Sequence, residues 1–556
     1  MTDSSKAQGD DGRFYVSTGG RAPTHALEPY DLAALLLVAL LCIVAAFTVR
    51  DYGISNDEEV QHRYGELILA YYASGFTDRA VFTYKNLYLY GGLFDIVAVL
   101  LARTLPFDPY LIRHVLCAAI GIAGIAGVWA TARLVAGPRA GFLAACAFAV
   151  TAVWYGAMFN HTKDIPFAAA MLWAVFFLLR IARDLPHPQW RDVLGFGALL
   201  GAACGLRAIG MLLVGYAGLV VLVQLAQVVR DHRAASMAFA ARSAIRLAPG
   251  ILLGYTIMLA SWPWAAQDLL NPVRAIFAFA QFQYEIRTLL AGTVYTMSEV
   301  PRWYVPAYLV IKLPLLVLAA AVLAGVLTVT RTGLRHLSAL GEARRAVWLL
   351  WFSVAFPVLA EVIGQGPAFT GMRHFYFVVP PLAVLAGIGL DTALAWSAAR
   401  HRLAAPATAV ALSAVLLWQA SLIIRLHPHQ YLYYNALVGG LPGAAGRYEM
   451  DYWVNIMPEA VTRLKALLDR EGKQTPERPF TVGVCGERFS FENEADARME
   501  WTGGWYEAAF FIAPTHMNCD HATNGNPVIK IERLGVLIGV VKDRRGYPSP
   551  AAPATP

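Results

Sequence analysis

Apolar stretches of about 17 to 25 residues recur along the chain, and they limit its fold more than any other feature. A segment of this length forms an α-helix that can cross the hydrocarbon core of a membrane, whereas a membrane β-barrel has shorter, alternating segments. Of the 556 residues, 57% are hydrophobic and 15% are charged. Soluble proteins have a charged share of about 25%. The sequence therefore predicts an α-helical multi-span membrane protein.

About eleven segments are predicted to span the membrane. They lie near 31–49, 110–132, 140–158, 165–182, 193–206, 208–229, 246–264, 306–329, 346–363, 374–396 and 404–424. Arginine-rich loops mark the cytoplasmic side of such a protein, and here arginines cluster at 133–139, 180–191, 230–246, 331–345 and 400–402. The N-terminus is then inside and the C-terminus outside. These loops also explain the net charge of +7 better than nucleic-acid binding does.

One further apolar segment, 87–105, is predicted not to cross the membrane. It contains Gly91, Gly92 and Asp95 and is followed by Pro106. A full crossing there would move every later arginine cluster to the other side. We therefore expect a re-entrant or interfacial helix that belongs to the first outer loop, with an ordinary span as the alternative.

The composition becomes that of a soluble domain after Arg425. A helix at 458–468 and short strands at 480–484, 508–512, 528–531 and 536–541 are predicted there. The sequence thus predicts four parts: a cytoplasmic segment 1–30, a transmembrane domain 31–424, a small periplasmic α/β domain 425–545 and a disordered tail 546–556.

The stretch Ile54-Ser55-Asn56-Asp57-Glu58-Glu59 follows the first span directly. Acidic residues this close to a membrane are costly unless they face water or take part in chemistry. Asp57 and Glu58 are therefore the first catalytic candidates.

A second polar island, 160–166, joins two spans on the same predicted side. Its Asp164 could share work with Asp57, because one carboxylate can act as general base on a hydroxyl while another orients the acceptor or holds a metal. A solvated turn is the alternative for Asp164. The island also supplies two candidates for substrate binding, His161 and Lys163.

Several basic residues are candidates for binding a donor phosphate. Arg207 lies in a tight hairpin after a short span, Arg373 and His374 lie at the outer mouth of a later span, and Lys312 lies inside another. Arginine and lysine hold phosphate through charge-assisted hydrogen bonds. Each could instead anchor the protein at the membrane interface.

A long outer loop, 262–304, is rich in aromatic residues and ends at Tyr304. Aromatic faces suit sugar rings as well as lipid boundaries. Tyr304 is therefore a candidate for substrate binding, with an interfacial belt as the alternative.

Metal binding and a disulfide both stay open from the sequence. His62 follows Glu58 by four residues, which would place both on one helix face, but no recognised Cys and His spacing accompanies them. A divalent metal is the one cofactor left open. Cys485 and Cys519 both fall in the outer domain, where an oxidising compartment permits a disulfide.

Taken together, these features resemble the GT-C superfamily of membrane glycosyltransferases, in the branch related to protein O-mannosyltransferases and lipid A aminoarabinose transferases. The resemblance covers roughly residues 31–400, and its motifs are Asp57-Glu58, His161 to Pro166, Gly205-Leu206-Arg207, Pro301-Arg302-Trp303-Tyr304 and Arg373-His374 before Pro380-Pro381.

The resemblance implies a GT-C fold with juxtamembrane helices in the first outer loop. It implies that Asp57 is the catalytic base, that Asp164 helps to form the site, and that the donor is a sugar on a polyprenyl phosphate. The stretch 427–453 resembles a tail of uncharacterised bacterial members, and it lacks the repeats of eukaryotic protein mannosyltransferases. The acceptor is therefore left as a lipid, a glycan or a protein.

The leading hypothesis is a glycosyltransferase of the bacterial inner membrane whose active site faces the periplasm. A transporter or flippase of lipid-linked or envelope substrates is the main alternative, and an assembly protein that presents the outer domain is a third. Charges confined to the outer rim favour the enzyme, because a transport path would place them at mid-membrane.

Overall fold

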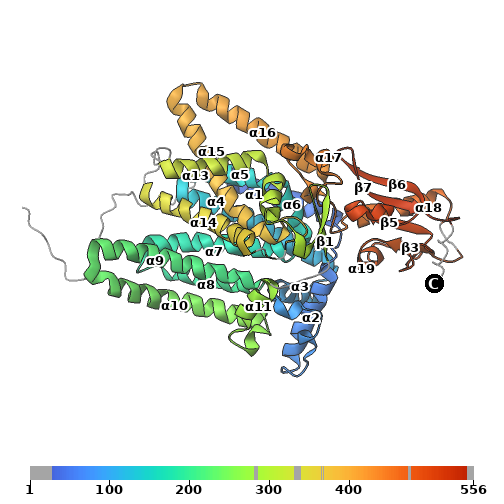
Figure 1. The fold of residues 1–556 in the computed structure, drawn as a ribbon, viewed down its shortest axis with the longest axis horizontal. Helices are drawn as coiled ribbons and strands as arrows, with labels where there is room; N and C mark the ends of the chain where they lie inside the picture. The colour runs from blue at the N-terminus through green and yellow to red at the C-terminus, as the bar shows by residue number, and fades with distance from the viewer. Residues whose placement is uncertain are drawn as a thin grey trace, which may run out of the picture.

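The computed structural model describes residues 28–280, 286–330, 340–364, 366, 368–473 and 477–547. Figure 1 shows a bundle of long helices that run side by side, with a smaller part containing a β-sheet at one end of it. The predicted segment 1–30 and the predicted tail 546–556 lie almost wholly outside the described residues.

All segments predicted as spans lie on helices of this bundle. The helices, with those of the outer loops, are α1 (Pro29–Thr48), α2 (Glu58–Ala73), α3 (Leu93–Thr104), α4 (Pro109–Ala136), α5 (Pro138–Ala149), α6 (Ala152–Asn160), α7 (Asp164–Asp184), α8 (Trp190–Cys204), α9 (Leu212–His232), α10 (Ser236–Ser261), α11 (Asn271–Ala280), α12 (Tyr304–Lys312), α13 (Leu315–Thr330), α14 (Leu340–Gly364), α15 (Val379–Arg400) and α16 (Ala404–Leu426).

Seven stretches of the described residues are long and apolar enough to cross a membrane, or nine if each of two bent helix pairs counts as one span. One of the seven, Ala208–Ser261, holds both α9 and α10. Helix α8, with 15 residues, falls below the length required of a span. The predicted class of polytopic helical membrane protein is confirmed, with a span count close to the one expected.

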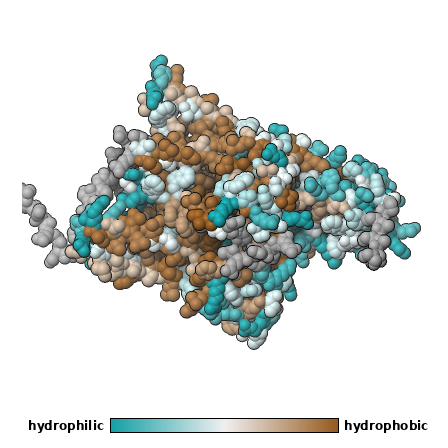
Figure 2. All heavy atoms as spheres, in the orientation of Figure 1, coloured by the Kyte–Doolittle hydropathy of each residue, from teal (hydrophilic) through white to brown (hydrophobic). Residues whose placement is uncertain are grey.

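The surface of the bundle agrees with a lipid environment. Figure 2 shows apolar side chains spread over the helices and polar ones over the sheet-containing part. On α1, Phe47 is 84% exposed and Leu36 is 62% exposed. A soluble protein rarely leaves such a continuous apolar surface uncovered.

The short helix α3 occupies the segment predicted to be interfacial. Its 12 residues extend roughly 18 Å, too little to cross a membrane. The Leu93 N–H donates to the Gly205 carbonyl at 3.0 Å, and the Gly92 N–H donates to the Ser261 carbonyl at 2.9 Å. A Cβ at Gly91 would collide with the same Gly205 carbonyl. The two glycines therefore let α3 dock against the ends of α8 and α10.

Helices α12 and α13 form a bent pair, with an angle of 111° between them. Pro314 interrupts the helix because it lacks an N–H to donate. A side chain from beyond the last span compensates: the Asn435 amide donates to the carbonyls of Val310 at 2.6 Å and Leu313 at 2.8 Å. The Asn435 backbone N–H donates to the Ile311 carbonyl at 2.9 Å. The end of α12 is thus completed by the C-terminal part of the chain.

The C-terminal part packs α18 (Met457–Arg470) against a five-stranded sheet with the order β4-β3-β5-β7-β6. The strands are β3 (Phe480–Val484), β4 (Met499–Trp501), β5 (Phe510–Pro514), β6 (Asn526–Arg533) and β7 (Val536–Asp543). Strand β3 is parallel to β4 and β5, and β7 is antiparallel to β5 and β6. The predicted helix and strands fall on α18, β3, β5, β6 and β7, whereas β4 is too short to show a pattern.

Cys485 and Cys519, which follow β3 and β5, form a disulfide with their Cα atoms 6.5 Å apart. Near the same place, His516 Nδ1 lies 3.3 Å from a carboxylate oxygen of Glu449. Glu449 in turn accepts from the backbone N–H of Leu289 at 2.7 Å, in the hairpin of β1 (Arg287–Leu290) and β2 (Thr293–Thr296). Glu449 therefore connects the disulfide-linked segment to the β1-β2 hairpin.

Candidate active site

Asp57 lies directly before the first residue of α2, in the connection between α1 and α2. The turn is fixed from both sides, because the Gly53 N–H donates to the Asn455 side chain at 2.7 Å and the Ser55 hydroxyl donates to the Asn160 carbonyl at 3.3 Å. The Asp57 side chain is nevertheless 40% exposed. A rigid turn thus presents a carboxylate that solvent or a substrate can reach.

Four charged side chains from distant parts of the sequence form a row of ion pairs that ends at Asp57, and we call this row the charged chain. Arg373 donates through Nη2 to Asp57 at 2.5 Å and through Nε to Asp164 at 3.1 Å. Arg207 donates to the other oxygen of Asp164. Asp164 is 3% exposed, so its charge must be balanced by its neighbours. The guanidinium groups of Arg207 and Arg373 supply that balance.

Glu58, the next residue, belongs to a different cluster. Its Oε2 accepts from the Ser55 N–H at 2.8 Å and lies 3.1 Å from His114 Nε2. Arg113 lies 3.9 Å from the other oxygen and donates to Asp95 at 2.8 Å. Glu58 and Arg113 are both fully buried. Glu58 therefore faces this buried cluster and supports the Asp57 turn, and the catalytic role expected for it stays a prediction.

The second polar island is the turn between α6 and α7. Neither ring nitrogen of His161 has a hydrogen-bond partner in the part of the chain that the structure describes. Lys163 Nζ lies 4.2 Å from the ring centroid of Tyr90. Burial lowers the pKa of His161 to about 3 and the pKa of Lys163 to about 8. At neutral pH the imidazole is uncharged and the amine is mostly charged. Both groups have polar atoms left for a ligand.

Aromatic rings surround His161 beside the charged chain. The centroid distances from His161 run from 5.4 to 6.2 Å, and the rings are those of Tyr376, Tyr431, Tyr452 and Trp453. The guanidinium carbon of Arg373 lies 4.3 Å from the Trp453 ring centroid. Such an aromatic wall can stack on a sugar and can hold a cation in place.

Tyr304 is buried and contacts the backbone near Arg373. It is 1% exposed, and its hydroxyl accepts from the Gly371 N–H at 2.8 Å. This bond fixes the turn that precedes Arg373. The structure therefore gives Tyr304 a positioning contact, where the sequence led us to expect contact with substrate.

Two predicted phosphate ligands form no ion pair with the charged chain among the described residues. Lys312 Nζ donates to the Tyr431 carbonyl at 2.9 Å and lies 3.7 Å from the Tyr434 ring centroid. The His374 ring packs against Phe369, with 4.7 Å between centroids. Neither side chain pairs with an acid of the site within the described residues. Both interact instead with aromatic or backbone groups.

The structure does not assemble the predicted metal candidates. Among the described residues, no group of three or more His, Cys, Asp and Glu side chains could hold a metal ion. Glu58 is engaged in its buried cluster, and His62 Nε2 lies 4.0 Å from Glu66.

Sequence reasoning missed two sets of residues. Trp453 and Asn455 reach the site from beyond the last span, and Gly53 and Asn455 are 402 residues apart. Arg113 and His114 lie in the second turn of α4 and pair with Asp95 and Glu58. The second set carries a usable signal, because ionisable residues at the end of a span are rarely there without a partner.

Comparison with protein families gave one match: residues 110–253 match the family of dolichyl-phosphate-mannose-protein mannosyltransferases. Comparison with curated protein sequences gave no match. Among solved structures, ArnT from Cupriavidus metallidurans bound to undecaprenyl phosphate is similar, with a TM-score of 0.48, 16% identity and coverage of 92% of this chain and 98% of that one. The apo oligosaccharyltransferase of Archaeoglobus fulgidus is also similar, with a TM-score of 0.42, 12% identity and coverage of 86% and 65%.

The family match includes α4, α7 and the Arg207 hairpin, and thus Asp164 and Arg207 of the charged chain. Over residues 110–253 the chain is similar to that family of membrane glycosyltransferases, which agrees with the resemblance seen in the sequence.

Proposed function

We propose that this protein transfers a sugar from a polyprenyl-phosphate donor to a hydroxyl acceptor. The observation that carries the proposal is the position of Arg373 between the exposed Asp57 and the buried Asp164. A base and a phosphate-binding cation are then adjacent, which is what this transfer requires. The matching family is named for transfer from dolichyl-phosphate mannose, a sugar on a polyprenyl phosphate.

The geometry supports a coupling between donor binding and the base. In the structure Arg373 neutralises Asp57. A donor phosphate would take the place of the Asp57 carboxylate on Arg373, while Asp164 keeps the guanidinium oriented. Asp57 would then be free to accept a proton. The protein would thus expose its base only when the donor is present.

The transfer itself follows from these positions. The acceptor oxygen forms a bond to the anomeric carbon, and the bond between that carbon and the phosphate oxygen breaks. The phosphate leaves with the electron pair, and Arg373 stabilises its charge. The hydroxyl proton passes to Asp57.

The other residues of the site suit the phosphate and the sugar of the donor. Lys163 and Arg207 lie over the same Tyr90 ring, at 4.2 and 6.0 Å from its centroid, and add positive charge near Asp164. His161 and Trp453 offer a hydrogen-bonding group and an aromatic face for the sugar. We place this site at the outer face of a bacterial inner membrane, since Arg133, Arg183 and Arg400 lie in the last turns of α4, α7 and α15, away from the site.

The test uses purified protein with mannose on dolichyl phosphate and with other sugars on polyprenyl phosphates, and envelope lipids, glycans and proteins are added to supply the hydroxyl acceptor. We expect release of the polyprenyl phosphate, measured by mass spectrometry. Arg373→Ala should raise the KM for the donor about tenfold or more, because one charge-assisted hydrogen bond is worth about 1.5–3 kcal/mol. Arg402→Ala, at an exposed position, is the matched control.

The transport alternative gives a different result in the same preparation. In liposomes, a flippase would move a fluorescent lipid-linked sugar between leaflets and leave the bond between sugar and phosphate intact. Movement without cleavage, together with no release from any donor, would overturn the proposed function.

A further inference from the structure

A cavity of about 480 Å³ lies among α4, α7, α9 and α14, far from the charged chain. Asp164 begins the 21-residue α7, and Arg183 lies near its other end. The two residues are therefore roughly 28 Å apart along the helix axis. The cavity opens at the arginine-rich end of the bundle, which the sequence predicts to be cytoplasmic.

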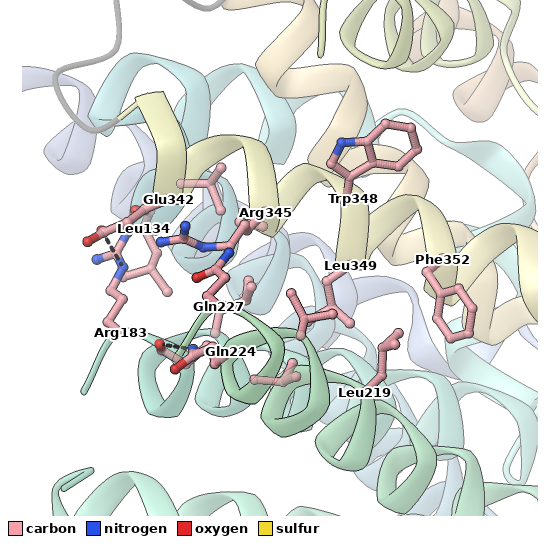
Figure 3. A pocket seen from close by; sticks show the side chains of 16 residues that line it. Leu134, Arg183, Leu219, Gln224, Gln227, Glu342, Arg345, Trp348, Leu349 and Phe352 are labelled. Carbon is pink, nitrogen blue, oxygen red and sulfur yellow. Dashed lines mark hydrogen bonds and ion pairs between the residues drawn. The ribbon is translucent and has the colours of Figure 1, made fainter. Parts of the chain in front are cut away.

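The cavity has a polar end and an apolar body. Figure 3 shows Arg183, Gln224, Gln227, Glu342 and Arg345 gathered on one side, with Leu219, Trp348, Leu349 and Phe352 on the other. A small polar solute would leave the apolar body unused. A ligand with a polar head and a hydrocarbon tail covers both parts.

Two of the polar side chains are already engaged. Arg183 donates to the Leu134 carbonyl at 2.6 Å and lies 3.7 Å from Glu342. Gln224 donates to the Ala182 carbonyl.

Arg345 is exposed and forms no ion pair or hydrogen bond within the residues that the structure describes. Its guanidinium and the Gln227 amide are therefore open to a ligand at the polar end. The positive charge available there is complementary to an anionic group.

We propose that this cavity binds an anionic phospholipid, independently of the transfer reaction. The lipid phosphate would lie at Arg345 and Gln227, and one acyl chain would lie against Leu219 and Phe352. Basic pockets between helices at the cytoplasmic membrane surface suit phospholipid head groups. The polyprenyl donor does not fit here, because its phosphate would have to reach Arg373 at the other end of the bundle.

The experiment counts lipids bound to the full-length protein by native mass spectrometry. Phosphatidylglycerol and phosphatidylcholine with identical acyl chains are compared. We expect one retained phosphatidylglycerol and much weaker retention of phosphatidylcholine. Arg345→Gln should weaken phosphatidylglycerol binding about tenfold, as expected for one charge-assisted hydrogen bond. Arg402→Gln removes an exposed arginine at the same predicted side and should leave binding unchanged.

A second variant tests the apolar body. Leu219→Trp fills the cavity and should abolish retention of the lipid while the Arg345 head-group site stays intact. Equal retention of both lipids, or unchanged binding by Arg345→Gln, would overturn the proposal. Displacement of the bound phosphatidylglycerol by polyprenyl phosphate at equal concentration would also overturn it, because the cavity would then belong to the donor.

Discussion

Asp57 and Glu58 are neighbours in the sequence, yet they belong to two clusters of charged side chains that differ in exposure and in partners. Asp57 is 40% exposed and pairs with Arg373, which lies 316 positions later in the chain. Glu58 is fully buried and pairs with His114 and the backbone of its own turn. We call them the open cluster (Asp57, Arg373, Asp164, Arg207) and the closed cluster (Glu58, His114, Arg113, Asp95).

The difference follows from helix geometry. Both acids lie at the start of α2, where successive side chains point about 100° apart. One therefore faces the open side and the other faces α4. The clusters remain connected, because Arg113 donates at 3.2 Å to Thr162, which lies in the island that carries Asp164. We infer that the buried closed cluster helps to keep the side chains of the open cluster in the geometry that catalysis needs.

The largest effect is expected from exchanging one oxygen for nitrogen in each cluster. Asp57→Asn should lower the transfer rate about 10²- to 10⁴-fold, because an amide cannot accept the hydroxyl proton. Glu58→Gln should cost far less in rate. Transfer by purified variants is the measurement, with thermal unfolding as the control for folding. Near-normal transfer by Asp57→Asn would remove Asp57 as the base.

The closed cluster should show its importance in stability. Arg113→Met leaves Asp95 without its buried partner, and the loss of one member of a buried pair typically costs about 3–5 kcal/mol. Arg63→Met is the matched control, because Arg63 pairs with Glu66 at the surface and such pairs contribute about 0–1 kcal/mol. Unfolding of both variants in one detergent gives the comparison. Equal melting temperatures would contradict a structural role for the closed cluster.

Lys163, which lies near the open cluster, should make donor binding depend on pH. Its pKa is about 8, so the amine loses its charge as the pH rises through 8. If this charge assists the donor phosphate, the KM for the donor should rise above pH 8, by about tenfold per pH unit at most. Lys163→Arg should remove that dependence, because arginine stays charged.

The effect on stability has the opposite sign, and this separates it from binding. The pKa of Lys163 in the folded protein lies below its ordinary value of 10.5. The unfolded chain therefore binds more protons between pH 8 and 10.5, and this group makes the free energy of unfolding rise with pH in that window. A KM that rises together with falling stability would contradict the role given to Lys163.

The smallest effect is expected at the aromatic wall. Trp453→Leu removes the ring that lies 4.3 Å from the Arg373 guanidinium. Such a contact is worth about 0.5–2 kcal/mol, so the KM for the donor should rise a few-fold. Trp501→Leu is the control. The Trp501 ring lies in β4, and its centroid is 4.9 Å from the guanidinium carbon of Arg488. Equal effects of both substitutions would point to a general loss of stability.

The sequence predicted which loops carry charge but not how far each side chain reaches. Asp57, Asp164, Arg207 and Arg373 were all predicted from their places at span ends, and the structure joins them in one chain. The sequence also suggested Glu58 for catalysis. It could not show that this side chain points into the bundle, because that direction depends on how α2 packs against α4. The sequence suggested Lys312 for the phosphate. Hydropathy could not show that its amine donates to the Tyr431 carbonyl, which lies 119 positions later in the chain.

The contact of Asn435 with the end of α12 also constrains how the protein is made. During synthesis from the N-terminus, the carbonyls of Val310 and Leu313 enter the membrane before Asn435 exists. The Val310 carbonyl lacks its final partner until the chain has grown further, because Asn435 lies 125 positions after Val310. The broken helix pair can therefore reach its final form only after the last span is in place. A chain that stops after α16 would leave the carbonyls of Val310 and Leu313 without the Asn435 amide.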